Sequence, residues 1–271
     1  MEAVILCGGK GTRLREETEF RPKPLVEIGD YPILWHIMRH YRHFGVKDFV
    51  LCLGYKGSMI RDYFLNYNMH QCNCRLDMAT DAVEAFDATT PLDWRISFID
   101  TGQETLTGSR LRMALPYLKG ERFFATYGDG VSNVDLQLLL KRHRENGKLA
   151  TVTAVHPSSR FGELDLHDGA VRSFVEKPQV TDGWINGGFF VFEKKALMRL
   201  PLEESNVSLE GQLLEQLSAE NQLGVYEHDG FWQCMDTYRE MQMLDGLWKS
   251  GKAEWKTWSD EPLATSKAEC A

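Results

Sequence analysis

The sequence predicts an α/β protein in which helices cover both faces of a mixed, mainly parallel β-sheet. Three observations indicate this class. Short apolar runs alternate with amphipathic segments along the 271-residue chain, a glycine-rich loop follows the first apolar run, and 43% of the residues are hydrophobic, enough for a full core. Alternating strands and helices indicate a parallel sheet, because parallel neighbours are joined by crossover segments that are usually helical.

The expected elements follow from the spacing of apolar residues. Apolar runs of five to seven residues predict buried strands, and apolar residues three and four positions apart, as at Leu136, Leu139 and Leu140, predict helices. The expected strands are 3–7, 48–53, 95–99, 123–127, 149–155 and 222–227. The expected helices are 33–44, 56–66, 107–118, 135–147, 207–218 and 237–249.

Two segments interrupt this alternation. Residues 67–94 are polar, acidic and longer than an ordinary connection, so we expect an irregular functional excursion or a contact between subunits. Residues 158–193 predict a small β-rich excursion, because Phe161-Gly162, Asp168-Gly169 and Gly187-Gly188 separate short strand-like runs.

The chain is expected to form one domain, residues 1–258. Trp255 and Trp258 lie on a stretch without periodicity and are predicted to pack against the body of the protein. Residues 259–271 are expected to be a disordered tail.

Composition excludes several classes of function. The formal charge is −8 and no block of lysine and arginine occurs, so nucleic-acid binding is not expected. No run approaches 18 apolar residues, and the N-terminus lacks the pattern of a signal peptide, so no membrane association is expected. The six cysteines form no disulfide framework, which predicts free thiols in a reducing cytoplasm.

Histidines at positions 36, 40 and 43 share one predicted helix face. No glutamate accompanies them in an H-E-x-x-H arrangement, so a metal site is not predicted. We expect a surface stripe or a stripe that faces another subunit. Phe231 and Trp232 are predicted to pack in the core and to position Asp236.

The loop L-C-G-G-K-G-T-R-L at residues 6–14 is a candidate phosphate site, because ligands of parallel sheets bind beyond the carboxyl ends of the strands. It is not a P-loop, since Gly11 precedes Thr12 and not Lys-Ser or Lys-Thr. It is not a dinucleotide fingerprint, since Leu14 stands where the third glycine belongs. The remaining interpretation is a loop whose backbone amides wrap a triphosphate, with Arg13 and Lys23 adding positive charge. A plain tight turn would not explain Thr12-Arg13.

Several motifs occur in one order along the chain. They are residues 3–14, Arg21-Pro22-Lys23-Pro24-Leu25-Val26, Pro32-Ile33-Leu34, Tyr127-Gly128-Asp129-Gly130, Phe174-x-Glu176-Lys177-Pro178, Ile185-Asn186-Gly187-Gly188-Phe189 and Met235-Asp236-Thr237. Together they resemble the sugar-1-phosphate nucleotidylyltransferases. Further motifs, among them Trp255-Lys256-Thr257-Trp258, make the chain most similar to the glucose-1-phosphate cytidylyltransferase family, over residues 1 to about 259.

This resemblance implies a Rossmann-like nucleotidyltransferase fold and an activity. CTP and α-D-glucose 1-phosphate would give CDP-glucose and pyrophosphate, for the synthesis of deoxysugars of polysaccharides or secondary metabolites. It also implies a homo-oligomer with active sites near subunit interfaces. Three alternatives stay open: another sugar phosphate or a phosphonate as acceptor, thymidylyl or uridylyl transfer, and a catalytically silent nucleotide-sensing subunit.

The resemblance also assigns the site residues. It places Arg13, Lys23 and Asp129 in catalysis, and Mg²⁺ on Asp129 and Asp236. It places the nucleotide against Leu6, Gly8, Gly9, Lys10, Gly11, Thr12, Arg13, Lys23, Thr105, Arg110 and Gly128. It places the sugar phosphate against Glu176, Lys177, Asn186 and Gly187.

The chain departs from the family pattern at a few positions. Lys10 replaces a small or apolar residue, Cys7 replaces alanine, and Cys234 replaces a proline, which would loosen the loop that carries Asp236. Residues 205–215 lack the family's tryptophan and Glu-Pro, and residues 67–94 retain little of the pattern. Because these two segments can shape the sugar pocket, nucleotidyl transfer is the firmer half of the prediction.

Overall fold

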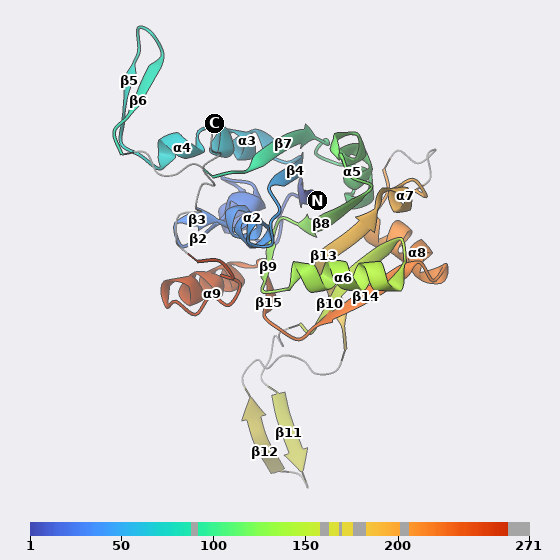
Figure 1. The fold of residues 1–271 in the computed structure, drawn as a ribbon. Helices are drawn as coiled ribbons and strands as arrows, with labels where there is room; N and C mark the ends of the chain where they lie inside the picture. The colour runs from blue at the N-terminus through green and yellow to red at the C-terminus, as the bar shows by residue number, and fades with distance from the viewer. Residues whose placement is uncertain (88–91, 158–162, 168–169, 176–182, 201–205, 260–271) are drawn as a thin grey trace, which may run out of the picture.

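The computed structural model describes residues 1–87, 92–157, 163–167, 170–175, 183–200 and 206–259. A seven-stranded sheet lies at the centre, in the order β14-β10-β13-β8-β1-β4-β7 (Figure 1). Its strands are β1 (Ala3–Cys7), β4 (Asp48–Leu53), β7 (Arg95–Asp100), β8 (Arg122–Tyr127), β10 (Ala150–Val155), β13 (Ile185–Glu193) and β14 (Leu223–His228). Only β13 runs antiparallel to its neighbours, β8 and β10, so the prediction of a mixed, mainly parallel sheet is confirmed.

Helices cover both faces of the sheet. The α-helices are α1 (Arg15–Thr18), α2 (Ile33–His43), α3 (Gly57–Leu65), α4 (Tyr67–His70), α5 (Thr107–Ala114), α6 (Leu136–Asn146), α7 (Lys194–Leu197), α8 (Glu215–Ala219) and α9 (Tyr238–Lys249). Shorter turns are η1 (Lys23–Leu25) and η2 (Leu115–Tyr117), both 3₁₀, and η3 (Leu209–Leu214), a π-helix.

Two hydrophobic cores lie on opposite faces of the sheet. In β1, Ala3, Ile5 and Cys7 face the core formed with α2, α3, α6 and α9, whereas Val4 and Leu6 face the core formed with α5, α7, η3 and α8. Side chains of a strand alternate between faces, so a central strand that is apolar throughout must be buried on both sides. The glycine-rich loop therefore begins at the end of the most enclosed strand.

Two predicted helices differ from the observed ones. The predicted helix 107–118 ends as an α-helix at Ala114 and continues as a 3₁₀ turn, because Pro116 has no N–H for the next helical hydrogen bond. The predicted helix 207–218 is divided into η3 and α8.

Two hairpins project from the body (Figure 1). One consists of β5 (Cys74–Asp77) and β6 (Ala82–Ala85) within the segment that we expected to be irregular. Both strands are exposed along their whole length, so they lack the alternation of buried and exposed residues that identifies a strand in sequence. The other hairpin, β11 (Glu163–His167) with β12 (Ala170–Val175), agrees with the predicted β-rich excursion.

The C-terminal tryptophans pack as predicted, and they bring a correction for the histidines. Trp255 and Trp258 are buried against α2. His36 and His40 are buried with them, so the predicted surface stripe is wrong; only His43 of the three is exposed. His36 accepts a hydrogen bond from the Trp255 indole at Nδ1, and its Nε2 lies 2.9 Å from the Ile28 carbonyl oxygen.

The remaining pairs of strands are short. They are β2 (Glu27–Ile28) with β3 (Tyr31–Pro32), and β9 (Gly130–Ser132) with β15 (Trp232–Cys234). Within the described parts of the chain, none of the helices has both the length and the apolar character needed to span a membrane. The predicted tail lies almost wholly in 260–271, outside the described residues.

Candidate active site

The glycine-rich loop lies where the parallel strands β1, β4 and β8 end. Gly11 has a φ of +61°, and a Cβ there would lie 2.8 Å from Thr18 and 3.2 Å from the stem of Lys23. A Cβ on Gly8 would lie 2.1 Å from the guanidinium of Arg110. Gly8 and Gly11 are therefore needed for close packing beneath the loop, whereas Gly9 is open to the cavity.

Arg110 of α5 fixes the underside of this loop. Its guanidinium is buried and donates to the carbonyl oxygens of Gly8, Leu53, Gly102 and Gln103, and to the Thr101 hydroxyl. The loops that follow β1, β4 and β7 are thus tied to one side chain. The predicted contact of Arg110 with the nucleotide stays a prediction, although Arg110 also lines the cavity described below.

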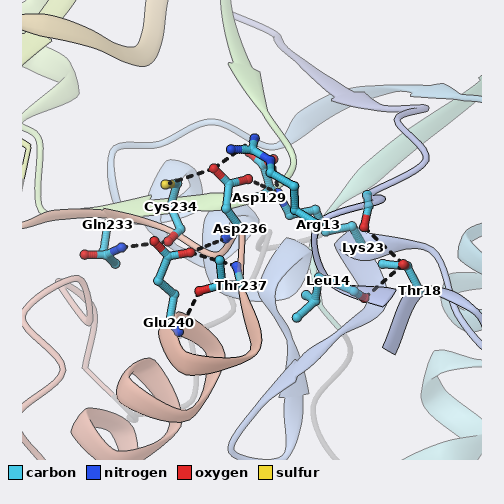
Figure 2. A network of polar contacts seen from close by, with 11 residues as sticks. Arg13, Leu14, Thr18, Lys23, Asp129, Gln233, Cys234, Asp236, Thr237 and Glu240 are labelled. Atoms are coloured by element: carbon cyan, nitrogen blue, oxygen red, sulfur yellow. Dashed lines mark hydrogen bonds and ion pairs between the residues drawn. The ribbon is translucent and has the colours of Figure 1, made fainter. Parts of the chain in front are cut away.

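Lys23, Asp129 and Asp236 form the centre of the site (Figure 2). The Lys23 ammonium donates to Asp129 Oδ2 at 2.7 Å and to Asp236 Oδ1 at 2.6 Å. Arg13 lies on the outer side, with Nη2 3.0 Å from Asp236 Oδ2. Lys23 is only 7% exposed, so it is not a solvated surface lysine, and its ammonium is not directed at the open glycine-rich loop.

The two aspartates are far apart in the sequence and are brought together by backbone pairing. Asp129 precedes β9, Asp236 follows β15, and these strands pair with Gly130 opposite Cys234. The Met235 amide donates to the Asp129 carbonyl oxygen at 2.8 Å. This pairing fixes the separation of the two carboxylates.

Several hydrogen bonds hold the loop that carries Asp236, although Cys234 stands where the family has proline. Glu240 accepts hydrogen bonds from the amides of Asp236 and Thr237, both at 2.7 Å, and Thr237 caps α9 in return. The Cys234 thiol donates to Asp236 Oδ2 at 3.6 Å. Trp232 adds a further anchor, since its indole donates to the Gly187 carbonyl oxygen.

The carboxylates and the ammonium stabilise one another's charges. Burial lowers the pKa of Lys23, but its attraction to Asp129 and Asp236 outweighs burial and raises that pKa overall. Burial raises the pKa of Asp236, but the hydrogen bond and charge of Lys23, with Arg13, lower it overall. Both shifts favour the charged forms of Lys23 and Asp236 at neutral pH.

A cavity of about 620 Å³ opens above the glycine-rich loop. It extends from the loop to residues 103–107, and Tyr127, Asp129, Glu210 and Asp236 close its inner end. Its volume is within the range of sites for nucleotide-sized ligands. The predicted nucleotide contacts line it together: Leu6, Gly8, Gly9, Lys10, Gly11, Thr12, Arg13, Lys23, Thr105, Arg110 and Gly128.

A second cavity of about 210 Å³ adjoins the first. Asn186, Gly187 and Trp232 line it, and four residues line both cavities: Arg13, Tyr127, Asp129 and Asp236. The two cavities thus meet at the carboxylate pair.

Some predicted residues have roles that the sequence did not indicate. Lys10 forms an ion pair with Glu104 at 2.6 Å at the rim of the larger cavity. A Cβ on Gly128 would lie 3.0 Å from the Leu6 carbonyl oxygen, so this glycine is needed for close packing against β1 as well as lining the cavity. Glu176 and Lys177 lie outside the described residues.

Sequence reasoning missed Tyr127 and Glu210. The Tyr127 hydroxyl donates to Glu210, which also accepts from the hydroxyls of Thr107 and Ser208. Asn186 donates weakly to the same tyrosine, so this network joins the two cavities. Tyr127 stood within a recognised motif, but Glu210 lies in a segment that departs from the family pattern and gave no signal.

The carboxylate pair is suited to one divalent cation. Both aspartates already converge on a single positive charge, the Lys23 ammonium. Mg²⁺ is commonly held by one or two carboxylates together with substrate phosphates and water. No cluster of three or more acidic, histidine or cysteine ligands occurs among the described residues, so an ion held here would need phosphate and water oxygens as its remaining ligands.

Fold and site together define a class of enzyme. The chain belongs to the nucleotidyl transferase family, whose model matches residues 2–260. It is 46% identical over 259 residues to the glucose-1-phosphate cytidylyltransferase of Salmonella typhimurium, which covers 95% of this chain and 100% of that protein. A probable glucose-1-phosphate cytidylyltransferase of Bacillus subtilis is 44% identical, with the same coverage. The resemblance predicted from the sequence is confirmed.

A solved structure supports the fold independently. HddC from Yersinia pseudotuberculosis superposes with a TM-score of 0.68 over 91% of this chain and 99% of that chain, at 24% sequence identity. At this identity the likeness concerns the fold alone. The predicted Rossmann-like nucleotidyltransferase architecture is confirmed.

Proposed function

We propose that this enzyme transfers the cytidylyl group of CTP to α-D-glucose 1-phosphate and releases pyrophosphate. The observation that carries the proposal is the meeting of two cavities at Asp129 and Asp236. A nucleotide in the larger cavity and a sugar phosphate in the smaller one would bring their phosphates together there. The 46% identity to a glucose-1-phosphate cytidylyltransferase supports the choice of CTP and glucose.

The chemical problem is to bring two anions into contact. A nucleoside triphosphate carries about four negative charges and a sugar phosphate about two, since the second pKa of a phosphate is near 6. Their repulsion at contact distance amounts to several kcal/mol even with substantial screening. Arg13 and Lys23 supply positive charge at the junction of the cavities, and Asp129 and Asp236 would hold Mg²⁺.

The reaction needs no residue that acts as nucleophile or base. The phosphate oxygen of the acceptor is already ionised at neutral pH, and it forms the new bond to the α-phosphorus as the bond to pyrophosphate breaks. Bound Mg²⁺ supplies charge neutralisation and alignment of the phosphates. Arg13 and Lys23 stabilise the charge that develops on the phosphate oxygens.

The smaller cavity is suited to a sugar. Asn186 offers an amide for a hydroxyl group, and Trp232 offers an apolar face. Gly187 also lines the cavity, and it lets β13 pack closely on β10, since a Cβ there would lie 2.7 Å from Val155. We retain Glu176 and Lys177 as contacts to the sugar hydroxyls and the phosphate. Because residues 205–215 depart from the family pattern, a different sugar phosphate, or a phosphonate, is the main alternative acceptor.

The test is release of pyrophosphate from each of CTP, UTP, dTTP, ATP and GTP with a panel of sugar 1-phosphates, with and without Mg²⁺. We expect release with CTP and glucose 1-phosphate, and only with the metal. Release with dTTP or UTP alone would contradict the assignment of the base. If none of the five nucleotides gave pyrophosphate, the result would indicate a silent nucleotide-sensing subunit. Against that alternative, Lys23, Asp129 and Asp236 are all in place.

A matched variant connects this activity to the site. Asp129→Asn should lower kcat/KM at least about 100-fold, as loss of one electrostatic contact to a transition state does. Its far-ultraviolet circular dichroism should be unchanged, since the residue lies in a loop. Near-normal turnover would remove Asp129 from the site.

We also propose a cytoplasmic location and a homo-oligomeric state. The five cysteines within the described residues are all free thiols, as a reducing compartment allows. Exposed apolar side chains on the β5–β6 hairpin, such as Leu76 and Met78, favour a contact with another subunit. Sharing of active sites between subunits stays a prediction.

A further inference from the structure

We propose that Lys23 and Arg13 neutralise the carboxylate pair in the free enzyme, and so keep a divalent cation out until nucleotide phosphates attract these two side chains away. The inference rests on the proposed function, because it assigns the metal to Asp129 and Asp236. It adds an order of events: the bare enzyme does not hold the metal, and the nucleotide makes the metal site available.

The first observation is that cations already occupy the inner oxygens of the pair (Figure 2). Lys23 Nζ lies 2.7 Å from Asp129 Oδ2 and 2.6 Å from Asp236 Oδ1. Arg13 Nη2 lies 3.0 Å from the second oxygen of Asp236. An ion bridging both aspartates would have to displace the ammonium from the oxygens that it now bridges.

The second observation is the balance of charge. Two carboxylates and two cationic side chains add up to zero, so the cluster attracts an approaching divalent cation little. Lys23 and Asp236 have side chains only 9% and 14% exposed, so water screens their interactions poorly. A bound divalent ion would also repel the Lys23 ammonium, whose hydrogen-bond partners in the described part of the chain are these two carboxylates.

The third observation is that both cations are attached beside the loop expected to hold the triphosphate. The stem of Lys23 passes beneath Gly11, since a Cβ there would lie 3.2 Å from Lys23 Cβ. Its ammonium is thus attached next to the loop expected to hold the triphosphate, and its chain of four methylene groups is flexible. The Arg13 side chain is 67% exposed, so it can turn without disturbing the core.

The test is titration of the enzyme with Mn²⁺ in the absence of nucleotide, followed by the electron paramagnetic resonance signal of free Mn²⁺. Manganese prefers the same oxygen ligands as magnesium. Wild-type enzyme should bind Mn²⁺ weakly. Lys23→Ala and Arg13→Ala should each bind it more tightly, by roughly 10- to 100-fold for Lys23, because one positive charge at contact distance is removed.

Two further variants serve as controls. Lys10→Ala removes a positive charge from the same cavity, but from a lysine paired with Glu104, so Mn²⁺ binding should not change. The double variant Lys23→Ala with Asp129→Asn should lose the gained affinity. Arg13 is exposed, so Arg13→Ala is expected to fold. It therefore provides the test if Lys23→Ala does not fold.

Three results would overturn the inference. They are tight Mn²⁺ binding by the wild type, no gain in either single variant, and a gain that survives Asp129→Asn. None of these measurements contains CTP or a sugar. If the enzyme transferred no cytidylyl group, the pyrophosphate assay would show it, and the Mn²⁺ titration would be unaffected.

Discussion

Arg110 illustrates how one buried side chain organises this site. Its guanidinium supports Gly8 from below and binds the loops that follow β4 and β7. Hydrogen bonds from a charged donor are worth more than neutral ones, and removal of Arg110 would take a donor from four carbonyl oxygens at once. Two of these oxygens, those of Gly8 and Leu53, would keep other donors from the backbone and from Thr101. The loop that lines the larger cavity therefore depends on a residue of α5 for its shape.

Arg110→Ala should lower the free energy of unfolding by about 2–4 kcal/mol, measured with urea and without ligand. The KM for CTP should rise as the loop loses its support. Arg110→Lys should not restore stability, because one ammonium cannot reach all five acceptors. Met113→Ala, on an exposed position of the same helix, is the matched control. Unchanged stability of Arg110→Ala would show that it acts on the nucleotide alone.

At the scale of single residues, the sequence predicted which residues form the site better than it predicted which residues they contact. Lys23, Asp129 and Asp236 were found from motifs, but the ammonium that we assigned to the triphosphate lies on the two carboxylates. Ion pairs between distant positions depend on the tertiary fold, and a sequence gives no distances. Glu210 was missed for the same reason.

Helix α2 shows that the environment of a whole helix also depends on residues far away in the sequence. Its histidines follow the spacing of a surface stripe, yet both His36 and His40 are buried. Trp255 packs against His36, whereas His40 lies against Phe189 and the hydroxyl of Thr257. Burial lowers the pKa of His36 to about 4 and that of His40 to about 3. His36 is held as a neutral ring, because its Nδ1 accepts a hydrogen bond from Trp255.

The neutral histidines should make stability depend on pH. Below pH 6.5 the unfolded chain binds a proton at His36, whereas the folded protein does so only near pH 4, so stability falls as the pH drops between these values. From pH 7 to 5 the loss is about 2 kcal/mol per buried histidine. Urea unfolding of His36→Gln at both pH values should show a smaller loss than the wild type by this amount.

His43→Gln changes the exposed histidine of the same helix and should leave the pH dependence as it is in the wild type. An equal loss of stability in the wild type and His36→Gln would contradict a neutral buried ring. The sequence could not reveal this burial, because the covering residues come from the other end of the chain.

Elements with a strong local signal were predicted well. The bounds of β1 and β4 match the expected strands because both are apolar runs buried on two faces. Helix α5 ends at Ala114, earlier than the apolar spacing predicted, because Pro116 follows. The β5–β6 hairpin was missed because it buries neither face.

At the scale of the whole molecule, the parallel sheet explains the site. Parallel strands end at one edge, so the loops after β1, β4, β7 and β8 gather there, and those after β1, β7 and β8 line the larger cavity. The antiparallel strand β13 brings Asn186 and Gly187 to the same edge from the opposite direction. The fold class was predictable from the alternation of elements, but the two adjoining cavities were not.

The central claim is that donor and acceptor occupy these two cavities and meet at Asp129 and Asp236. A crystal structure of the enzyme with CDP-glucose and Mg²⁺ tests it most directly. We expect the cytidine in the larger cavity above Gly9 and Gly11, the glucose beside Asn186, and the diphosphate at the carboxylate pair. A diphosphate bound away from both aspartates and from the glycine-rich loop would contradict the account.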